Sequence, residues 1–372
     1  MISQKHEKFP ILFSKGSIES VELKNRTIVS PMTRTSAKEN GIVTNQMAEY
    51  YSEFARGGWG LIIAEATYID EKYSQGYNNQ PGISNEAQME SWRKVVDLVH
   101  AEGVPIFLQI FHAGAVNQGN SWVDGSLAPS PIQPKGEQIS RYNGEGFFQI
   151  PREIRIEEID EIIESYASAT KRAHEVGFDG VEVHGANGYL MDQFLTTYTN
   201  KRNDVYGGGI ENRFKFHIDV MNAVRKAVPN HFPVGVRISQ TKVNDREYSW
   251  PGGVQDAEFI FSSLGKIENL FIDVCAHLGC APVFGSGKSL AGLAKEFSGS
   301  TVIANGKLDN PEEAERVLNL GEGDFVAIAK GALADPEWPH KIFQGLSPIP
   351  FQQEMITPLA TIENVITWRK EN

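Results

Sequence analysis

Eight short apolar runs recur along the chain, and amphipathic stretches separate them. The runs are rich in Val, Ile and Phe, lack a regular polar/apolar alternation, and span 27–32, 61–66, 104–111, 178–184, 233–238, 270–275, 301–305 and 325–329. This pattern is typical of strands buried on both faces, as in parallel sheets. Helical spacing predicts helices over 89–99, 156–176 and 210–224, and weaker ones over 45–56, 254–265, 287–297 and 332–344. A further helix is predicted to begin after Asn310, which would cap it. Eight strand–helix alternations predict a closed (β/α)8 barrel, a TIM barrel, in one domain spanning residues 1–372.

Two of the predicted connections are too long for simple turns. They follow the second and third strands and span residues 69–85 and 113–153. Both leave the carboxyl ends of strands, the face on which barrel enzymes carry their sites. We expect 113–153 to form a lid or rim over a site, the alternative being a surface loop without a role.

Composition narrows the class of protein. The chain has 372 residues, 41% of them hydrophobic, which is enough to bury a large core. A formal net charge of −12 argues against a general nucleic-acid binder. Neither a long apolar stretch nor an apolar N-terminus is present, and there are only two cysteines, so we expect a cytoplasmic protein with no membrane span. Cys275, His277 and Cys280 lack a fourth ligand nearby, so no metal site is expected.

The chemistry-bearing residues stand where the predicted strands end. They include amides, one His, one Arg and two Lys, without a carboxylate pair or a G-x-S-x-G sequence, which argues against a hydrolase. Lys307 and Lys330 follow the last two strands, where barrels commonly hold a phosphate. His184 and Asn187 could polarise a carbonyl and Tyr189 could give a proton. The alternative is that these three are ordinary turn residues.

The same segments carry a resemblance to a known family. HGANGYL at 184–190, followed by NKRNDVYGGGIENR at 200–213, resembles the Old Yellow Enzyme family of flavin-dependent ene reductases. So do segments at five further places, namely 24–34, 64–67, 108–114, 235–239 and 331–339. The resemblance runs from about residue 10 to residue 345, in chain order, at seven of the eight predicted strand exits.

The resemblance implies a cofactor and a reaction. A tightly but non-covalently bound FMN would take a hydride from NADH or NADPH at N5 and pass it to the β-carbon of an α,β-unsaturated carbonyl, or to a similar electron-poor alkene, quinone or nitro acceptor. The residues implied to hold FMN are Pro31, Met32, Thr33, Ala66, Gln109, Arg237, Gly306, Lys307, Ala329 and Lys330. His184 and Asn187 would bind the substrate oxygen, and Tyr189 would protonate the α-carbon. Ala329-Lys330 stands where the family usually has Gly-Arg, and Lys lacks the bidentate fork, so we expect weaker FMN binding.

Two other functions remain open from the sequence. One is a flavin-free barrel lyase or isomerase that acts on a phosphorylated substrate, with Lys307 or Lys330 as a Schiff-base amine. The other is a non-catalytic flavin-binding redox sensor, which would have no need of His184, Asn187 and Tyr189. The physiological acceptor, the choice between NADH and NADPH, and the oligomeric state, including a homo-oligomer, also stay open.

Overall fold

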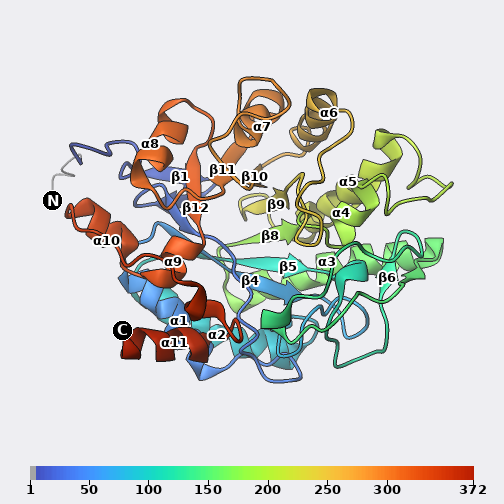
Figure 1. Ribbon diagram of the computed structural model, residues 1–372, viewed down its shortest axis with the longest axis horizontal. Coiled ribbons are helices and arrows are strands. Elements are labelled where there is room, and N and C mark those ends of the chain that lie inside the picture. Colours follow the sequence, from blue (N-terminus) through green and yellow to red (C-terminus); the bar gives the residue numbers. More distant parts are fainter. Residues whose placement is uncertain (1–5) are drawn as a thin grey trace.

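The computed structural model describes residues 6–372 and contains a closed barrel of eight parallel strands (Figure 1). The strands follow one another around the barrel in chain order, and the last pairs with the first. They are β3 (Thr27–Val29), β4 (Leu61–Tyr68), β5 (Ile106–Phe111), β8 (Gly180–His184), β9 (Val234–Ile238), β10 (Leu270–Cys275), β11 (Thr301–Asn305) and β12 (Phe325–Ile328). Each coincides with one of the eight predicted runs, so the predicted TIM barrel is confirmed.

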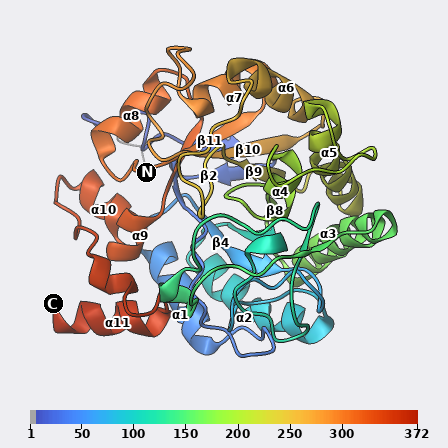
Figure 2. The same ribbon diagram turned by 45° about the vertical axis from the view of Figure 1, so that its right-hand side comes forward.

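Helices surround the barrel on its outside, as the two views show (Figures 1 and 2). They are α1 (Asn45–Arg56), α2 (Glu86–Ala101), α3 (Ile156–Val176), α5 (Ile210–Ala227), α6 (Val254–Leu264), α7 (Leu290–Ser298), α8 (Pro311–Asn319), α9 (Lys330–Ala334) and α10 (Trp338–Phe343). The predicted cap at Asn310 is confirmed, because its side chain accepts a hydrogen bond from the backbone N–H of Glu313.

The single helix predicted over 332–344 is wrong. The structure has two short helices there, α9 and α10, with Asp335 in an extended conformation between them. The residue before a proline is disfavoured in helical conformation, and Pro336 follows Asp335. The apolar spacing continues across the break, but the backbone does not.

A cluster of apolar side chains fills the barrel interior. Phe107 and Phe271 occupy its centre, and each faces a glycine of the paired strand, Gly180 and Gly235 respectively. A Cβ on either glycine would overlap the facing ring, so these strands need glycine at the two positions. A hairpin that the sequence did not predict, β1 (Gly16–Ile18) and β2 (Val21–Leu23), packs Ile18 and Leu23 into the same apolar cluster.

Longer connections leave the carboxyl ends of the strands. Residues 112–155 after β5 include η1 (Gly114–Val116), β6 (Leu127–Ala128), η2 (Ser140–Tyr142) and β7 (Arg152–Glu153). The short helix α4 (Leu190–Leu195) follows β8, and η3 (Gln353–Ile356) and α11 (Ile362–Glu371) end the chain, with α11 beside α1 (Figure 2). Across residues 6–372, none of the helices has the length and apolar content to cross a bilayer.

Candidate active site

A cavity of about 230 Å³ opens where the barrel strands end. Most of its lining belongs to residues predicted from the sequence, which are Pro31, Met32, Thr33, Ala66, Gln109, His184, Asn187, Tyr189, Arg237, Ala329 and Lys330. Two predicted residues, Gly306 and Lys307, do not line it. The structure therefore brings residues from six strand ends and the connections that follow them to one place.

Buried acids lie beneath the cavity. The amide nitrogen of Gln109 donates to Glu182 over 2.7 Å, and Arg237 Nε lies 3.5 Å from the carboxylate of Asp273. Burial, and then the nearby Asp273 carboxylate, raise the pKa of Glu182 well above its usual range. Burial also raises the pKa of Asp273. Both carboxyl groups therefore hold their protons more strongly than free acids do, and the Arg237 cation lies beside one of them.

Arg237 presents a charged donor to the cavity. Burial disfavours its charge, but the neighbouring acids, Asp273 foremost, keep its pKa above the usual value. One guanidinium nitrogen donates to the hydroxyl of Ser30 over 3.2 Å, and Asn305 donates to the same hydroxyl over 2.7 Å. Among the described residues, nothing accepts a hydrogen bond from Arg237 Nε. A buried cation with donor capacity to spare fits an anionic or electron-rich ring edge.

His184 is a neutral hydrogen-bond donor. Burial, and then the nearby Arg237 cation, hold the pKa of His184 well below its usual range. Its Nδ1 accepts a hydrogen bond from the backbone N–H of Ala186 over 3.3 Å. In a neutral ring the proton must then lie on Nε2, which leaves Nε2–H free for a ligand.

Asn187 and Tyr189 belong to the turn between β8 and α4. Asn187 has a left-handed backbone with φ of 61°, and its side chain lines the cavity. The Tyr189 hydroxyl lies 2.6 Å from the hydroxyl of Tyr77, and Phe111 packs edge-on against the Tyr189 ring. Burial raises the pKa of Tyr189 above its usual range, so the phenol is protonated at neutral pH.

The opposite end of the cavity carries the lysine of α9. Ala329 and Lys330 line it, and Lys330 Nζ lies 4.7 Å from the ring centre of Phe351. Gly306 and Lys307 form the neighbouring turn after β11, and the Lys307 side chain is exposed. Gly306 has a φ of 137°, and a Cβ there would overlap the carbonyl of Ala276, so only glycine suits this turn.

Several lining residues were missed from the sequence. They are Arg34, Arg141, Tyr142, Leu333, Phe351 and Ile356. Arg141 and Tyr142 come from the connection 113–153, which bears out its expected place at the rim. The Arg141 carbonyl accepts a hydrogen bond from Ala360 over 2.9 Å, so the C-terminal segment holds this rim in place. Segments this far apart in sequence leave no local signal that they meet.

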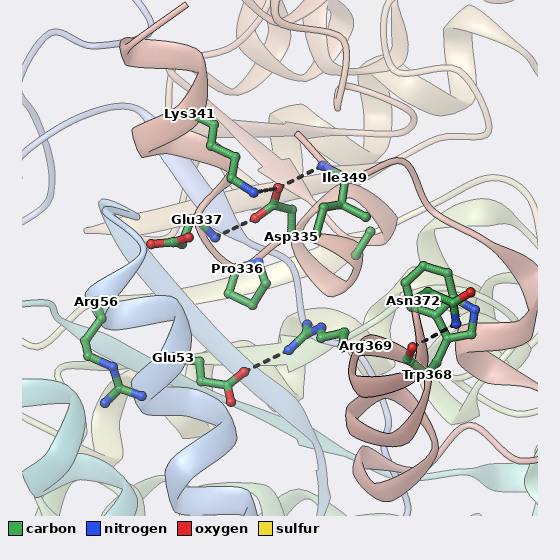
Figure 3. Close-up of a pocket in the computed structure, with 11 residues that line it drawn as sticks. Glu53, Arg56, Asp335, Pro336, Glu337, Lys341, Ile349, Trp368, Arg369 and Asn372 are labelled. Carbon is green, nitrogen blue, oxygen red and sulfur yellow. Dashed lines mark hydrogen bonds and ion pairs between the residues drawn. The ribbon is translucent and has the colours of Figure 1, made fainter. Parts of the chain in front are cut away.

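A larger cavity, of about 420 Å³, lies between α1, α10 and α11 (Figure 3). It shares no lining residue with the first. Ion pairs join Glu53 to Arg369 over 2.8 Å and Asp335 to Lys341 over 2.6 Å. The first pair ties the C-terminal helix α11 to α1, and the predicted strand-end chemistry is absent from this cavity's lining.

The smaller cavity fits FMN on its own features. The Arg237 cation on the cavity wall suits the electron-rich edge of a flavin ring, the Gln109 amide suits its pyrimidine edge, and Lys330 suits a phosphate. A TIM barrel with such a cavity at its carboxyl end points to the class of flavin-binding barrel oxidoreductases.

Comparisons with known proteins give the family. The model of the NADH:flavin oxidoreductase / NADH oxidase family matches residues 11–348. The chain is 36% identical over 338 residues to putative 12-oxophytodienoate reductase 2 of Oryza sativa subsp. japonica, covering 90% of this chain and 87% of that protein. It is 34% identical over 349 residues to the NADH oxidase of Thermoanaerobacter brockii, covering 91% of this chain but only 51% of that longer protein. The structure of the Old Yellow Enzyme homologue from Zymomonas mobilis matches with a TM-score of 0.84 and 29% identity, covering 95% of this chain and 99% of that one.

The chain therefore belongs to the NADH:flavin oxidoreductase / NADH oxidase family, the family of Old Yellow Enzyme. It is an FMN-dependent oxidoreductase of the ene-reductase type that takes its electrons from NAD(P)H. The predicted family, enzyme class and cofactors are confirmed. Membership in this family argues against both the flavin-free lyase and the non-catalytic sensor.

Proposed function

We propose that this chain reduces the C=C bond of an α,β-unsaturated carbonyl compound or a similar electron-poor acceptor, with Tyr189 as the proton donor. The observation that carries the proposal is the meeting of three groups on one cavity wall, the His184 imidazole, the Asn187 amide and the Tyr189 phenol. Two neutral donors and one weak acid are the set that reduction of an enone requires from a protein.

In this proposal His184 and Asn187 bind the carbonyl oxygen of the acceptor. Both donors are uncharged, so they polarise the carbonyl through hydrogen bonds alone. FMN, when bound, supplies the hydride. Its binding would fall to the residues predicted for it, with Thr33, Ala66, Gln109 and Arg237 toward the ring and Ala329 and Lys330 toward the phosphate.

Tyr189 supplies the proton to the α-carbon. Its raised pKa keeps the phenol protonated until charge develops on the substrate. Tyr77 faces its hydroxyl and can donate to the oxygen as the proton leaves. The oxygen would otherwise become a buried anion without a partner, which is costly.

The test is the double variant His184→Ala/Asn187→Ala. We expect it to keep bound FMN while turnover of 2-cyclohexen-1-one falls by about a hundredfold, because each lost donor to a developing oxyanion costs about tenfold or more. FMN content is read from the visible spectrum and turnover from NADPH oxidation under nitrogen. Unchanged turnover would show that His184 and Asn187 do not bind the carbonyl oxygen of the acceptor.

A further inference from the structure

A buried ion pair fastens the turn that carries Asn187 and Tyr189. Asp192, in the first turn of α4, is fully buried, and the Lys242 side chain, in the connection after β9, is 2% exposed. Lys242 Nζ lies 2.8 Å from each carboxylate oxygen of Asp192. The pair thus joins two connections that leave neighbouring strands.

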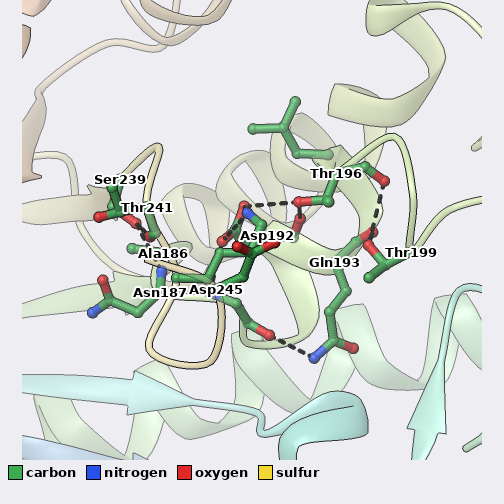
Figure 4. A network of polar contacts seen from close by, with 12 residues as sticks. Ala186, Asn187, Asp192, Gln193, Thr196, Thr199, Ser239, Thr241 and Asp245 are labelled. Atoms are coloured by element: carbon green, nitrogen blue, oxygen red, sulfur yellow. Dashed lines mark hydrogen bonds and ion pairs between the residues drawn. The ribbon is translucent and has the colours of Figure 1, made fainter. Parts of the chain in front are cut away.

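The carboxylate of Asp192 also holds the turn directly. The backbone N–H of Gly188 donates to it over 2.6 Å, and the Thr196 hydroxyl donates to it over 3.3 Å (Figure 4). Gly188 lies between Asn187 and Tyr189. A single carboxylate therefore connects Lys242 to the backbone between the two residues proposed to meet the acceptor.

Backbone contacts reinforce this link. The Asn187 carbonyl accepts from the N–H of Val243 over 3.0 Å, and its N–H donates to the Ser239 hydroxyl over 2.9 Å. Asn187 has a left-handed φ, which asparagine adopts more readily than most residues, and these two hydrogen bonds hold its backbone in that conformation. A Cβ on Gly188 would lie 3.2 Å from Lys242 Cβ, which shows how closely the two connections approach.

Stability alone does not account for a charged pair at this position. An apolar pair of similar volume would hold the two connections together about as well, because removing two charges from water offsets much of their attraction. The hydrogen bonds from Lys242 to both oxygens of Asp192 are directional, so they fix one geometry of the turn, whereas apolar packing allows several.

We propose that Lys242 and Asp192 are positioning residues that set where Asn187 and Tyr189 stand toward the acceptor. This inference rests on the proposed function, since it concerns the same wall of the cavity. Neither residue touches the acceptor, because neither lines the cavity. Both act through the backbone of the turn.

The experiment compares FMN-loaded wild type with Lys242→Met and the double variant Lys242→Met/Asp192→Asn. Two readouts concern the turn, the Kd of 4-chlorophenol, measured from the flavin spectrum, and the KM for 2-cyclohexen-1-one. Two others concern integrity, the melting temperature and the FMN content. Lys341→Met is the matched control, because Lys341 pairs with the buried Asp335 over 2.6 Å but belongs to the other cavity.

Lys242→Met should lower the melting temperature, raise the phenol Kd and the KM about tenfold through misplacement of Asn187, and leave the FMN content unchanged. The double variant should recover most of the melting temperature, since no charge is left unpaired, while the Kd and KM stay raised. Lys341→Met should lower the melting temperature without changing the Kd.

Recovery of Kd and KM together with the melting temperature in the double variant would overturn the inference, because the pair would then be structural only. If Lys242→Met does not fold, Asp192→Asn alone decides the matter, and a Kd within twofold of wild type overturns the inference. The failure of the proposed function would look different. The wild type would then bind 4-chlorophenol, and Asn187→Ala would weaken that binding, but the wild type would not reduce the enone. This result would refute the proposed reaction, and the comparison of Kd values would still test the positioning role.

Discussion

Tyr77→Phe should slow the proton step of enone reduction and leave the hydride donor's reaction unchanged. Tyr77 is buried, and its hydroxyl lies 2.6 Å from that of Tyr189. As Tyr189 gives up its proton, its oxygen gains negative charge, and a hydrogen bond to a charged group contributes about 1.5–3 kcal/mol. If about half of that charge has developed in the transition state, the loss is about 1 kcal/mol, or roughly fivefold in rate.

The assay follows the reduction of the flavin by NADPH and its reoxidation by the acceptor separately, both by anaerobic stopped flow. Enzyme reduced with one equivalent of NADPH is mixed with 2-cyclohexen-1-one or with a quinone, whose oxygens take protons from water without help from Tyr189. Only the enone reaction should slow in Tyr77→Phe. Tyr142→Phe is the control, because the Tyr142 hydroxyl also faces the site but donates to the carbonyl of Thr33, over 3.4 Å. An equal slowing with enone and quinone, or an unchanged enone rate, would refute this account of Tyr77.

Three further changes test Glu65, a buried acid on β4, the phosphate end of the cavity and the barrel interior. Burial raises the pKa of Glu65 to about 7 from the usual 4.5, so the folded chain keeps a proton that the unfolded chain loses, and unfolding free energy should fall by up to about 3 kcal/mol between pH 4.5 and 7. Glu65→Gln should flatten that slope in urea titrations, and equal slopes would contradict the assignment. Lys330→Arg should tighten FMN about fivefold by restoring a bidentate fork, measured as FMN Kd by fluorescence, and weaker binding would count against the placement of the phosphate. Gly235→Ala should lose about 2 kcal/mol of unfolding free energy through overlap with Phe271, whereas a loss below about 0.5 kcal/mol would show that the ring can move aside.

The barrel could be predicted from the sequence because its strands are apolar on both sides. The runs 270–275 and 301–305 coincide with β10 and β11, and 156–176 coincides with α3. The apolar pattern predicted one helix across Asp335-Pro336, but the proline disfavours helical conformation at Asp335, and the helix is interrupted there. The β1–β2 hairpin also escaped prediction, since each of its strands has only three residues.

The candidate site also has a part that the sequence predicts and a part that it does not. We call its floor the residues at the strand ends, among them His184, Gln109 and Arg237. They line the cavity because every barrel strand brings its carboxyl end to one face. Its rim depends on chain segments that meet only in three dimensions, so Tyr142 and Phe351 had no local signature. The Tyr77–Tyr189 contact, across 112 positions of sequence, had none either.

The contrast between floor and rim bears on how such enzymes diverge. The floor is part of the barrel itself, so we expect a change in Arg237 or Gln109 to disturb both the fold and the proposed flavin site. The rim consists of Arg141, Tyr142 and Phe351, which belong to connecting segments outside the barrel. Insertions and substitutions in these connections can reshape the entrance for new acceptors while the redox chemistry beneath is inherited unchanged.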